Sequence, residues 1–410
     1  MLAGVQEMDD RIGVGIVGLG LAATAHVKGY LSHPSAKVLA VCDTDGGRAA
    51  AFGERYGVER AYASYSELLD DRDVQVIDIA APTFLHATMT RQAAQAGKHI
   101  HCEKPFCRSV AEGMEAVRAV KNAGVKLLVG ETYVFLTSHM KARALIEEGA
   151  IGRPLQIRQR HGAWRRRTDH ELHLSAAARA WRLDGEQSGG GRYPWMFDHA
   201  VHFFATAEYL MEDATIDEVY AVVAAGSTGG RLAGASHDPY RTEELDIPII
   251  AWRYADATRQ GVWMRADPLN GKYDTMHGLC TTVVGETGMI EVLGEGGHNL
   301  LWEGRQQHLI LHRAGRETVC FRFDEEPDRV WDSEISYYGQ GHVNQVHHLL
   351  EAILHNQSLR YSGEEGVHAV RCTLATIRSA EEGRPVRVAE VGEAFTAYGE
   401  GDPKGKSAQT

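Results

Sequence analysis

The sequence lacks the long apolar runs that cross membranes, since no stretch approaches the roughly 20 apolar residues that a bilayer-spanning helix needs. Its first ten residues also lack the basic-then-apolar order of a secretory signal peptide. There is no excess of basic residues, because 43 Lys and Arg stand against 55 Asp and Glu, a net charge of −12. This balance argues against nucleic acid and anionic membrane surfaces as partners, and we expect a cytoplasmic protein.

Cysteine is scarce, with six residues, no Cys-x-x-Cys pair and no framework spacing, so we expect free thiols in a reducing compartment. Histidine is abundant, with 21 residues, which raises the question of a metal. The candidate ligand pairs are His170-x-x-His173, His347-His348 and Asp198-His199. None has a third ligand at a diagnostic spacing, so the sequence predicts no metal site.

What the sequence does contain is a glycine turn near its start. The apolar run Ile12 to Val17 predicts a buried parallel strand, and a predicted helix over Ala22 to Leu31 follows it. Between them, Gly18 permits a tight turn, Gly20 lets the backbone approach a pyrophosphate, and Ala23 lets the helix pack closely on the strand. The free N–H groups at the helix start favour phosphate. The pattern therefore predicts a dinucleotide site.

Asp43 follows a second predicted strand, Lys37 to Cys42, and lies about 20 residues beyond Gly20, where a dinucleotide fold holds the ribose hydroxyls. The carboxylates of Asp43 and Asp45 would repel a 2′-phosphate. No arginine directly follows the strand to accept that phosphate, although Arg48 lies one helical turn further on. The sequence therefore favours NAD over NADP as the cofactor.

The first third of the chain alternates predicted strands and helices. Two capping boxes, Ser64-x-x-Glu67 and Ser109-x-x-Glu112, mark helix starts. Such alternation predicts βαβ units with right-handed crossovers, and hence a doubly wound parallel sheet that binds its ligand at the carboxyl ends of its strands. We assign 10–130 to an NAD-binding Rossmann domain.

The pattern changes after residue 130. Short β-like runs without regular helices extend from 216 to about 323, which predicts a large, mostly antiparallel open sheet. Helices are predicted over His139 to Glu148, Asp198 to Met211, Gly341 to Leu354 and Glu364 to Glu381. We assign 131–385 to an α+β domain for substrate binding and oligomerisation, and expect a disordered tail at 399–410. The fold class is α/β.

Three further motifs follow the glycine turn in order: Ala-Pro-Thr-Phe-Leu-His at 81–86, Glu-Lys-Pro at 103–105, and Gly-Gly-Gly at 189–191 with Asp-His-Ala-Val-His at 198–202. Together they resemble the Gfo/Idh/MocA family of oxidoreductases, named after glucose–fructose oxidoreductase and inositol dehydrogenase. The resemblance covers about residues 10 to 385 and includes the closing Ser-Ala-Glu-Glu-Gly-Arg-Pro-Val at 379–386. It implies an NAD-dependent dehydrogenase acting on a secondary hydroxyl of a sugar, glycoside or cyclic polyol.

The residue chemistry agrees with this resemblance. A hydroxyl that loses a hydride must also lose a proton, so the site needs a base and a cation near the developing oxyanion. Asp198 and His202 are four residues apart on a predicted helix and share a face. By resemblance, Lys104 and His202 flank the reacting carbon, and Asp198 binds substrate or tunes the pair. The alternatives are a solvated lysine, an N-cap aspartate and a structural core histidine.

The predicted contacts with cofactor and substrate extend beyond these three residues. The expected cofactor-binding residues are Gly18, Gly20, Leu21, Ala22, Ala23, Asp43, Pro82, Thr83, His86, Glu103, Lys104, Glu131, Trp181 and Arg182. The expected substrate-binding residues are Lys104, Tyr133, His161, Asp198 and His202.

Other functions stay open at this point. Some relatives cleave a glycosidic bond by transient oxidation and elimination, and a nicotinamide-binding sensor would keep the fold without the chemistry. A reductase of an imine or ketone is a further alternative. The presence of Lys104 and His202 favours an enzyme over a sensor. An antiparallel sheet covered on one face leaves its other face open, and relatives pair through it, so we expect a homo-oligomer, a dimer or tetramer.

Overall fold

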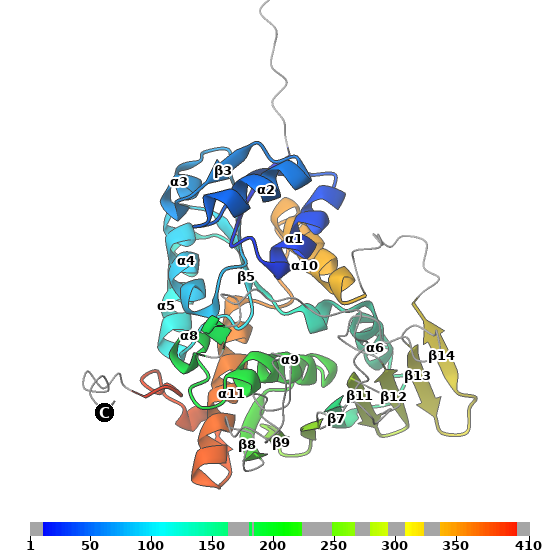
Figure 1. The fold of residues 1–410 in the computed structure, drawn as a ribbon. Helices are drawn as coiled ribbons and strands as arrows, with labels where there is room; N and C mark the ends of the chain where they lie inside the picture. Colours follow the sequence, from blue (N-terminus) through cyan, green and yellow to red (C-terminus); the bar gives the residue numbers. More distant parts are fainter. Residues whose placement is uncertain are drawn as a thin grey trace, which may run out of the picture.

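The computed structural model describes residues 11–162, 180–182, 184–223, 248–266, 279–293, 308–323 and 337–399. Two units, each built on one sheet, lie against each other, with the N-terminal unit at the top of Figure 1 and the second below it. Of the expected tail at 399–410, only Gly399 belongs to the described residues.

The first sheet has six parallel strands in the order β3-β2-β1-β4-β5-β6. Their bounds are β1 (Ile12–Val17), β2 (Ala36–Cys42), β3 (Arg60–Tyr62), β4 (Val76–Ile79), β5 (His99–Glu103) and β6 (Leu127–Gly130). The strand order reverses between β1 and β4, which is the switch point of a doubly wound sheet. The predicted Rossmann domain is confirmed.

The helices of this unit are α1 (Leu21–Ser32), α2 (Gly46–Tyr56), α3 (Tyr65–Asp70), α4 (Thr83–Gln95) and α5 (Val110–Ala123). The capping box predicted at Ser109 forms in part, since its hydroxyl accepts the N–H of Glu112, whose carboxylate accepts the N–H of Arg108. The one at Ser64 does not, because that hydroxyl bonds the side chain of Ser66 and the helix begins without a side-chain cap.

The second sheet has nine strands in the order β14-β13-β12-β11-β7-β10-β9-β8-β15. Their bounds are β7 (Pro154–Gly162), β8 (Ile216–Val223), β9 (Pro248–Tyr254), β10 (Gln260–Ala266), β11 (Leu279–Gly285), β12 (Gly288–Leu293), β13 (His308–Arg313), β14 (Val319–Arg322) and β15 (Val386–Arg387). Neighbours are antiparallel except for β7 and β10, which run parallel. The predicted mostly antiparallel open sheet is confirmed.

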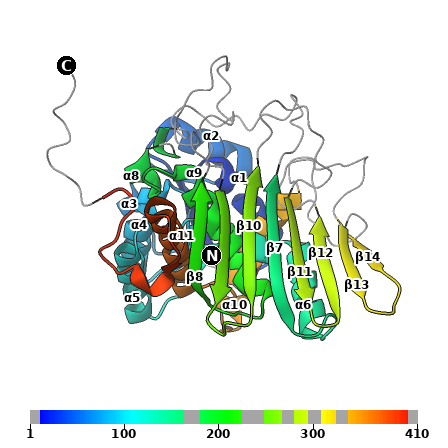
Figure 2. The ribbon, with the colours of Figure 1, turned by 90° about the horizontal axis from the view of Figure 1, so that it is seen from below.

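Helices cover one face of this second sheet and leave the other open (Figure 2). They are α6 (Thr137–Glu147), α9 (Pro194–Leu210) and α11 (Gly363–Glu382), with the short elements η1 (Thr132–Phe135), α8 (Gly185–Ser188) and η3 (Val388–Glu390) nearby. On the covered face, Phe203 of α9 stacks on Trp263 of β10 with ring centroids 4.5 Å apart. Aromatic packing of this kind seats α9 firmly on the sheet.

Helix α9 begins four residues before its predicted start at Asp198, and Tyr193 is its N-cap residue. Pro194 explains the earlier start, because proline is favoured in the first helical turn. Asp198 therefore lies inside the helix, which excludes the N-cap interpretation of that residue.

Helix α10 (Tyr337–Leu354) follows the second sheet in the chain but lies beside α1 of the N-terminal unit (Figure 1). Ser32 and His33 at the end of α1 each lie 2.9 Å from a side chain of α10, those of His347 and Glu351 respectively. The N-terminal unit therefore includes a helix from near the C-terminus. No helix among the described residues is long and apolar enough to cross a membrane.

The glycine turn gives a stability prediction. Gly18 has φ of +83°, and a Cβ there would lie 2.6 Å from the backbone nitrogen of Ala81, whereas a Cβ at Gly20 would meet no atom within 4 Å. We expect Gly18→Ala to lower the free energy of unfolding by about 1–3 kcal/mol through backbone strain and overlap. Denaturant unfolding measures this, with Gly20→Ala as the matched control. Equal losses in both variants would contradict the geometry.

Candidate active site

Lys104, which follows β5, contacts Asp198 in the first turns of α9. The Nζ atom of Lys104 donates to the Asp198 carboxylate Oδ1 and to its backbone carbonyl, both at 3.2 Å. The two side chains are only 15% and 18% exposed. Burial alone would raise the pKa of Asp198, but the Lys104 ammonium, with His199 and Arg182, holds that pKa well below its usual value. The Asp198 carboxylate is therefore ionised, and the pair is partly open to a ligand.

His202 lies one helical turn beyond Asp198 and is almost fully buried. Its Nδ1 atom hydrogen-bonds Oε1 of Glu131, the residue that follows β6. The ring of Tyr133 stacks on the imidazole, with centroids 4.4 Å apart and planes 14° from parallel. Glu131 and Tyr133 thus fix the plane and the Nδ1 partner of His202, so Nε2 is the other ring nitrogen, on the side away from Glu131.

The side chain of Glu131, a predicted cofactor contact, pairs with His202. It is fully buried, and its Oε1 atom also accepts the N–H of Tyr133 at 3.2 Å. Its Oε2 atom is buried without a hydrogen-bond partner among the described residues. The position of Glu131 at a strand end was visible in the sequence, but its histidine partner, 71 positions away, was not.

Asp43 lies beside the glycine turn, where the sequence predicts the dinucleotide site. Oδ2 of Asp43 accepts the N–H of Leu19 at 3.0 Å, which ties the end of β2 to the turn. Arg48 donates to both carboxylate oxygens of Asp43, at 3.3 and 3.1 Å. The space beside Gly20 is open, and Leu21 at the helix start is 57% exposed. These features fit a pyrophosphate at the start of α1 and a ribose near Asp43.

Other predicted cofactor residues lie around the same strand ends. Pro82 is the N-cap residue of α4, and Thr83 begins that helix and is buried. His86 is also buried, and its two ring nitrogens each lie 2.7 Å from a backbone carbonyl oxygen, one of Ala81 and one of Pro105. This position makes His86 a bridge between the chain segments that follow β4 and β5.

The remaining predicted residues divide between the site and its surroundings. The guanidinium of Arg182 stacks over the ring of Trp181 at 4.4 Å, and its charge acts on Asp198. Ala22 is half-buried and Ala23 is fully buried against β1, as expected for close packing. The backbone of His161 lies in β7, and its side chain lies outside the described part of the chain. His170 and His173 also lie outside it.

Glu103, the first residue of the Glu-Lys-Pro motif, turns away from Lys104 into a buried polar cluster. Its Oε1 atom lies 3.0 Å from Nε2 of His26 in α1. Burial alone would raise the pKa of Glu103, but the hydrogen bond and charge of His26 lower it to about 2. No motif in the sequence predicts this cluster. The residue that could have indicated the cluster is Asp78, which carries a charge within the otherwise apolar strand β4. A buried charge requires partners.

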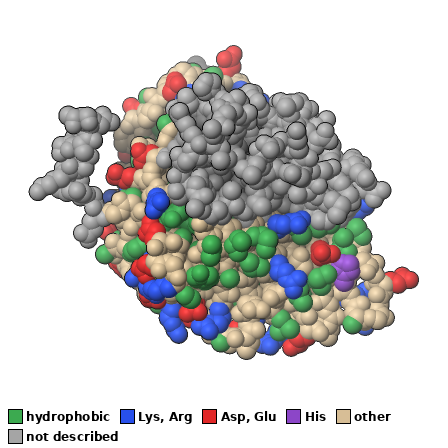
Figure 3. All heavy atoms as spheres, turned by 60° about the horizontal axis from the view of Figure 1, so that its bottom comes forward, with side chains coloured by type: hydrophobic (Ala, Val, Ile, Leu, Met, Phe, Trp, Pro, Cys, Tyr) green, Lys and Arg blue, Asp and Glu red, His purple; other side chains and the backbone are tan. Residues whose placement is uncertain are grey.

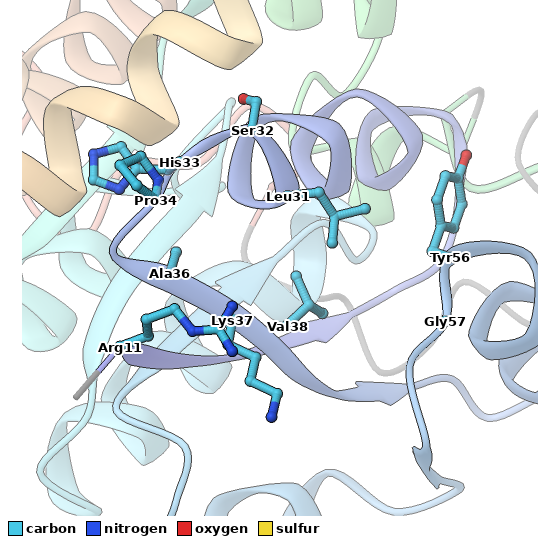
Figure 4. A pocket seen from close by; sticks show the side chains of 10 residues that line it. All are labelled: Arg11, Leu31, Ser32, His33, Pro34, Ala36, Lys37, Val38, Tyr56 and Gly57. Atoms are coloured by element: carbon cyan, nitrogen blue, oxygen red, sulfur yellow. The ribbon is translucent and has the colours of Figure 1, made fainter. Parts of the chain in front are cut away.

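A pocket of about 310 Å³ lies elsewhere, at the amino ends of β1 and β2 (Figure 4). Its lining includes Arg11, which precedes β1, and Ala36, which begins β2. Ligands of a doubly wound sheet bind at the carboxyl ends of the strands, which is the opposite edge. This pocket is therefore separate from the site around Lys104.

Comparison with known proteins agrees with this geometry. The chain matches the model of the Gfo/Idh/MocA oxidoreductase family with an NAD-binding Rossmann fold over residues 12–131, and the model of its C-terminal alpha/beta domain over 143–388. It is 26% identical to 1,5-anhydro-D-fructose reductase of Ensifer adhaerens, over 91% of this chain and 98% of that protein. It is 25% identical to myo-inositol 2-dehydrogenase of Thermotoga maritima, over 92% and 99%.

Among solved structures, levoglucosan dehydrogenase in complex with NADH and levoglucosan has the same fold. Its TM-score is 0.73 at 23% identity, with 92% of this chain and 99% of that chain covered. Both family models thus match in order, over both units of the fold, and the Glu-Lys-Pro and Asp-x-x-x-His motifs meet where the two units join. The protein is a member of the Gfo/Idh/MocA family of oxidoreductases, with an N-terminal NAD-binding Rossmann domain and the family's C-terminal alpha/beta domain.

Proposed function

We propose that the protein is an NAD-dependent dehydrogenase that oxidises a secondary hydroxyl of a sugar, a glycoside or a cyclic polyol. The observation that carries this proposal is the pairing of Lys104 with Asp198 one helical turn from the pairing of His202 with Glu131. The names of the anhydrofructose reductase and inositol dehydrogenase relatives support a carbohydrate or polyol as substrate. A screen of sugars, glycosides and inositols with NAD, read by absorbance of NADH, tests the substrate class.

In this proposal NAD, when bound, supplies the hydride acceptor, and the side chains handle the proton. Lys104 donates a hydrogen bond to the substrate hydroxyl and stabilises the negative charge that develops on its oxygen. His202 accepts the hydroxyl proton at Nε2. The Glu131 carboxylate on Nδ1 then lies beside the imidazolium that forms, and Asp198 holds the Lys104 ammonium in place.

The catalytic prediction concerns Lys104 and His202. We expect Lys104→Ala and His202→Ala each to lower turnover by about 10²–10⁴, the usual contribution of a positioned acid–base group, while NAD binding survives. Steady-state kinetics with a substrate from the screen and NAD titration of each variant measure the two quantities. His355→Ala is the control, since His355 follows α10, is 59% exposed and bonds Glu351.

Glu131→Gln tests, in the same experiment, whether Glu131 acts on the His202 imidazolium or only maintains the local structure. The amide keeps the shape but cannot stabilise the imidazolium, so we expect a lower turnover with an altered pH profile and little change in KM. Full turnover in His202→Ala would contradict the assignment. Net cleavage of a glycoside without accumulation of NADH would point instead to transient oxidation and elimination.

The cofactor prediction concerns Asp43. Its carboxylate repels a 2′-phosphate and accepts hydrogen bonds from ribose hydroxyls, although Arg48 partly neutralises it. We expect Asp43→Ala to weaken NAD binding and to relax discrimination against NADP, measured as the ratio of kcat/KM values for the two cofactors. A wild-type enzyme that already prefers NADP would contradict the carboxylate argument.

We also propose that the protein forms a homo-oligomer through the open face of the second sheet. Val222, Ile249 and Met264 stand side by side on neighbouring strands β8, β9 and β10, and they are 50%, 55% and 40% exposed. Figure 3 shows hydrophobic side chains, in green, gathered on this side of the molecule. A second copy of the sheet would cover this apolar row, because the same face on both copies is self-complementary in a two-fold dimer.

The assembly prediction uses this row. We expect the wild type to be a dimer or tetramer at micromolar concentration and Ile249→Asp to dissociate it, because a charge would be buried in an apolar interface. Light scattering measures the mass. Leu354→Asp is the matched control, since Leu354 is 41% exposed on α10, outside the sheet. A monomeric wild type would contradict the proposal.

A further inference from the structure

The buried cluster beneath the Glu-Lys-Pro motif joins three elements that are distant in the sequence. His26 comes from α1, Glu103 from the end of β5, and His342 and Gln345 from α10. His26 and Gln345 are fully buried, and Glu103 and His342 are 8% and 7% exposed. The catalytic scheme above uses none of these four side chains.

Four polar atoms of this cluster converge on one point. Nε2 of His26 lies 3.0 Å from Oε1 of Glu103 and 3.1 Å from Nδ1 of His342. The Glu103 and His342 atoms are 3.8 Å apart. The side-chain amide of Gln345 lies 3.4 Å from the His26 nitrogen and 3.1 Å from the His342 nitrogen.

Two hydrogen bonds, between His26 and Glu103 and between Gln345 and His342, account for only part of this arrangement. An imidazole nitrogen offers one direction in the plane of its ring, either as one donor or as one acceptor. Nε2 of His26 faces three polar atoms within 3.4 Å, and Nδ1 of His342 faces His26, Gln345 and the Thr132 hydroxyl within 3.4 Å. A single cation at the centre would serve all the converging atoms at once.

We propose that His26, Glu103, His342 and Gln345 bind a Zn²⁺ ion. Zinc bound tetrahedrally at about 2.0–2.1 Å separates its ligand atoms by about 3.3 Å, and the five distances in this cluster, 3.0 to 3.8 Å, lie around that value. Gln345 would present its amide oxygen, which a flip of the amide exchanges with the nitrogen. Before such a flip, the amide oxygen of Gln345 is buried and has no hydrogen-bond partner among the described residues.

A second set of contacts supports the metal. The other ring nitrogen of His26, Nδ1, lies 2.9 Å from Oδ1 of Asp78, whose Oδ2 lies 2.7 Å from Nδ1 of His101. A histidine that binds a metal usually donates its second N–H to a carboxylate, which orients the ring. Asp78 and Glu103 also bring two carboxylates into a fully buried place, and a divalent cation would balance their charge.

The proposed site is structural. Four protein ligands close the coordination sphere and leave no open position for substrate, as in structural zinc sites. The ion would fasten α10, which arrives from the second domain, to α1 and to the strand that carries Lys104. No short spacing motif predicts this site, because its ligands lie at positions 26, 103, 342 and 345.

The first measurement is the metal content of the full-length wild type, purified without a histidine tag and without added metal. Inductively coupled plasma mass spectrometry should find about one zinc per chain. After the zinc is removed by a chelator, added Co²⁺ should give the visible absorption of a tetrahedral site, and added Zn²⁺ should abolish it and raise the melting temperature. A wild type that holds no zinc and binds neither ion overturns the proposal.

Variants locate the ion. His342→Asn and Gln345→Leu should each lose most of the zinc, and Asp78→Asn should bind it about 10–100-fold more weakly, as measured by chelator competition. His347→Asn is the control on the same helix, since its ring bonds Ser32 and the Gly29 carbonyl instead. Unchanged zinc content in both His342→Asn and Gln345→Leu overturns the site. NAD binding is measured in parallel, so loss of zinc and failure of the proposed function are distinguishable.

Discussion

The ion pair between Lys104 and Asp198 is the contact on which the arrangement of the site depends. It joins the carboxyl end of a strand in the first sheet to a helix that packs on the second sheet. Partial burial strengthens the attraction between the two charges, because less water screens them. The same contact places His202, one turn along the helix, near the strand end that carries Glu131.

A second constraint is that each side chain proposed to be catalytic is held by a partner from another element. Asp198 holds Lys104, and Glu131 together with the ring of Tyr133 holds His202. Pre-organised groups of this kind do not need to reorient when a substrate binds, which is the main source of their effect on rate. His202 and Glu131 are thus buried, whereas Lys104 and Asp198 are partly exposed.

The N-terminal unit depends in turn on the helix α10 that returns to it late in the chain. His342 and Gln345 of this helix meet His26 and Glu103 inside the buried polar cluster. Buried polar groups are costly unless every one of them is satisfied, so this cluster fixes where α10 lies more strictly than apolar packing alone would. Because Glu103 precedes Lys104, the cluster also supports the chain segment that carries Lys104.

The sequence by itself determined the Rossmann domain, its order of elements and the open antiparallel sheet, because alternating apolar runs, capping boxes and the glycine turn are local signals. It also singled out Lys104, Asp198 and His202, through motifs within a few residues. Only the tertiary structure decided that Glu131 is the partner of His202, that Arg48 pairs with Asp43, and that Asp78 belongs to a histidine cluster. The last contact brings together residues more than 50 positions apart, and no local pattern records such proximity, because it arises only when sheet and helices pack.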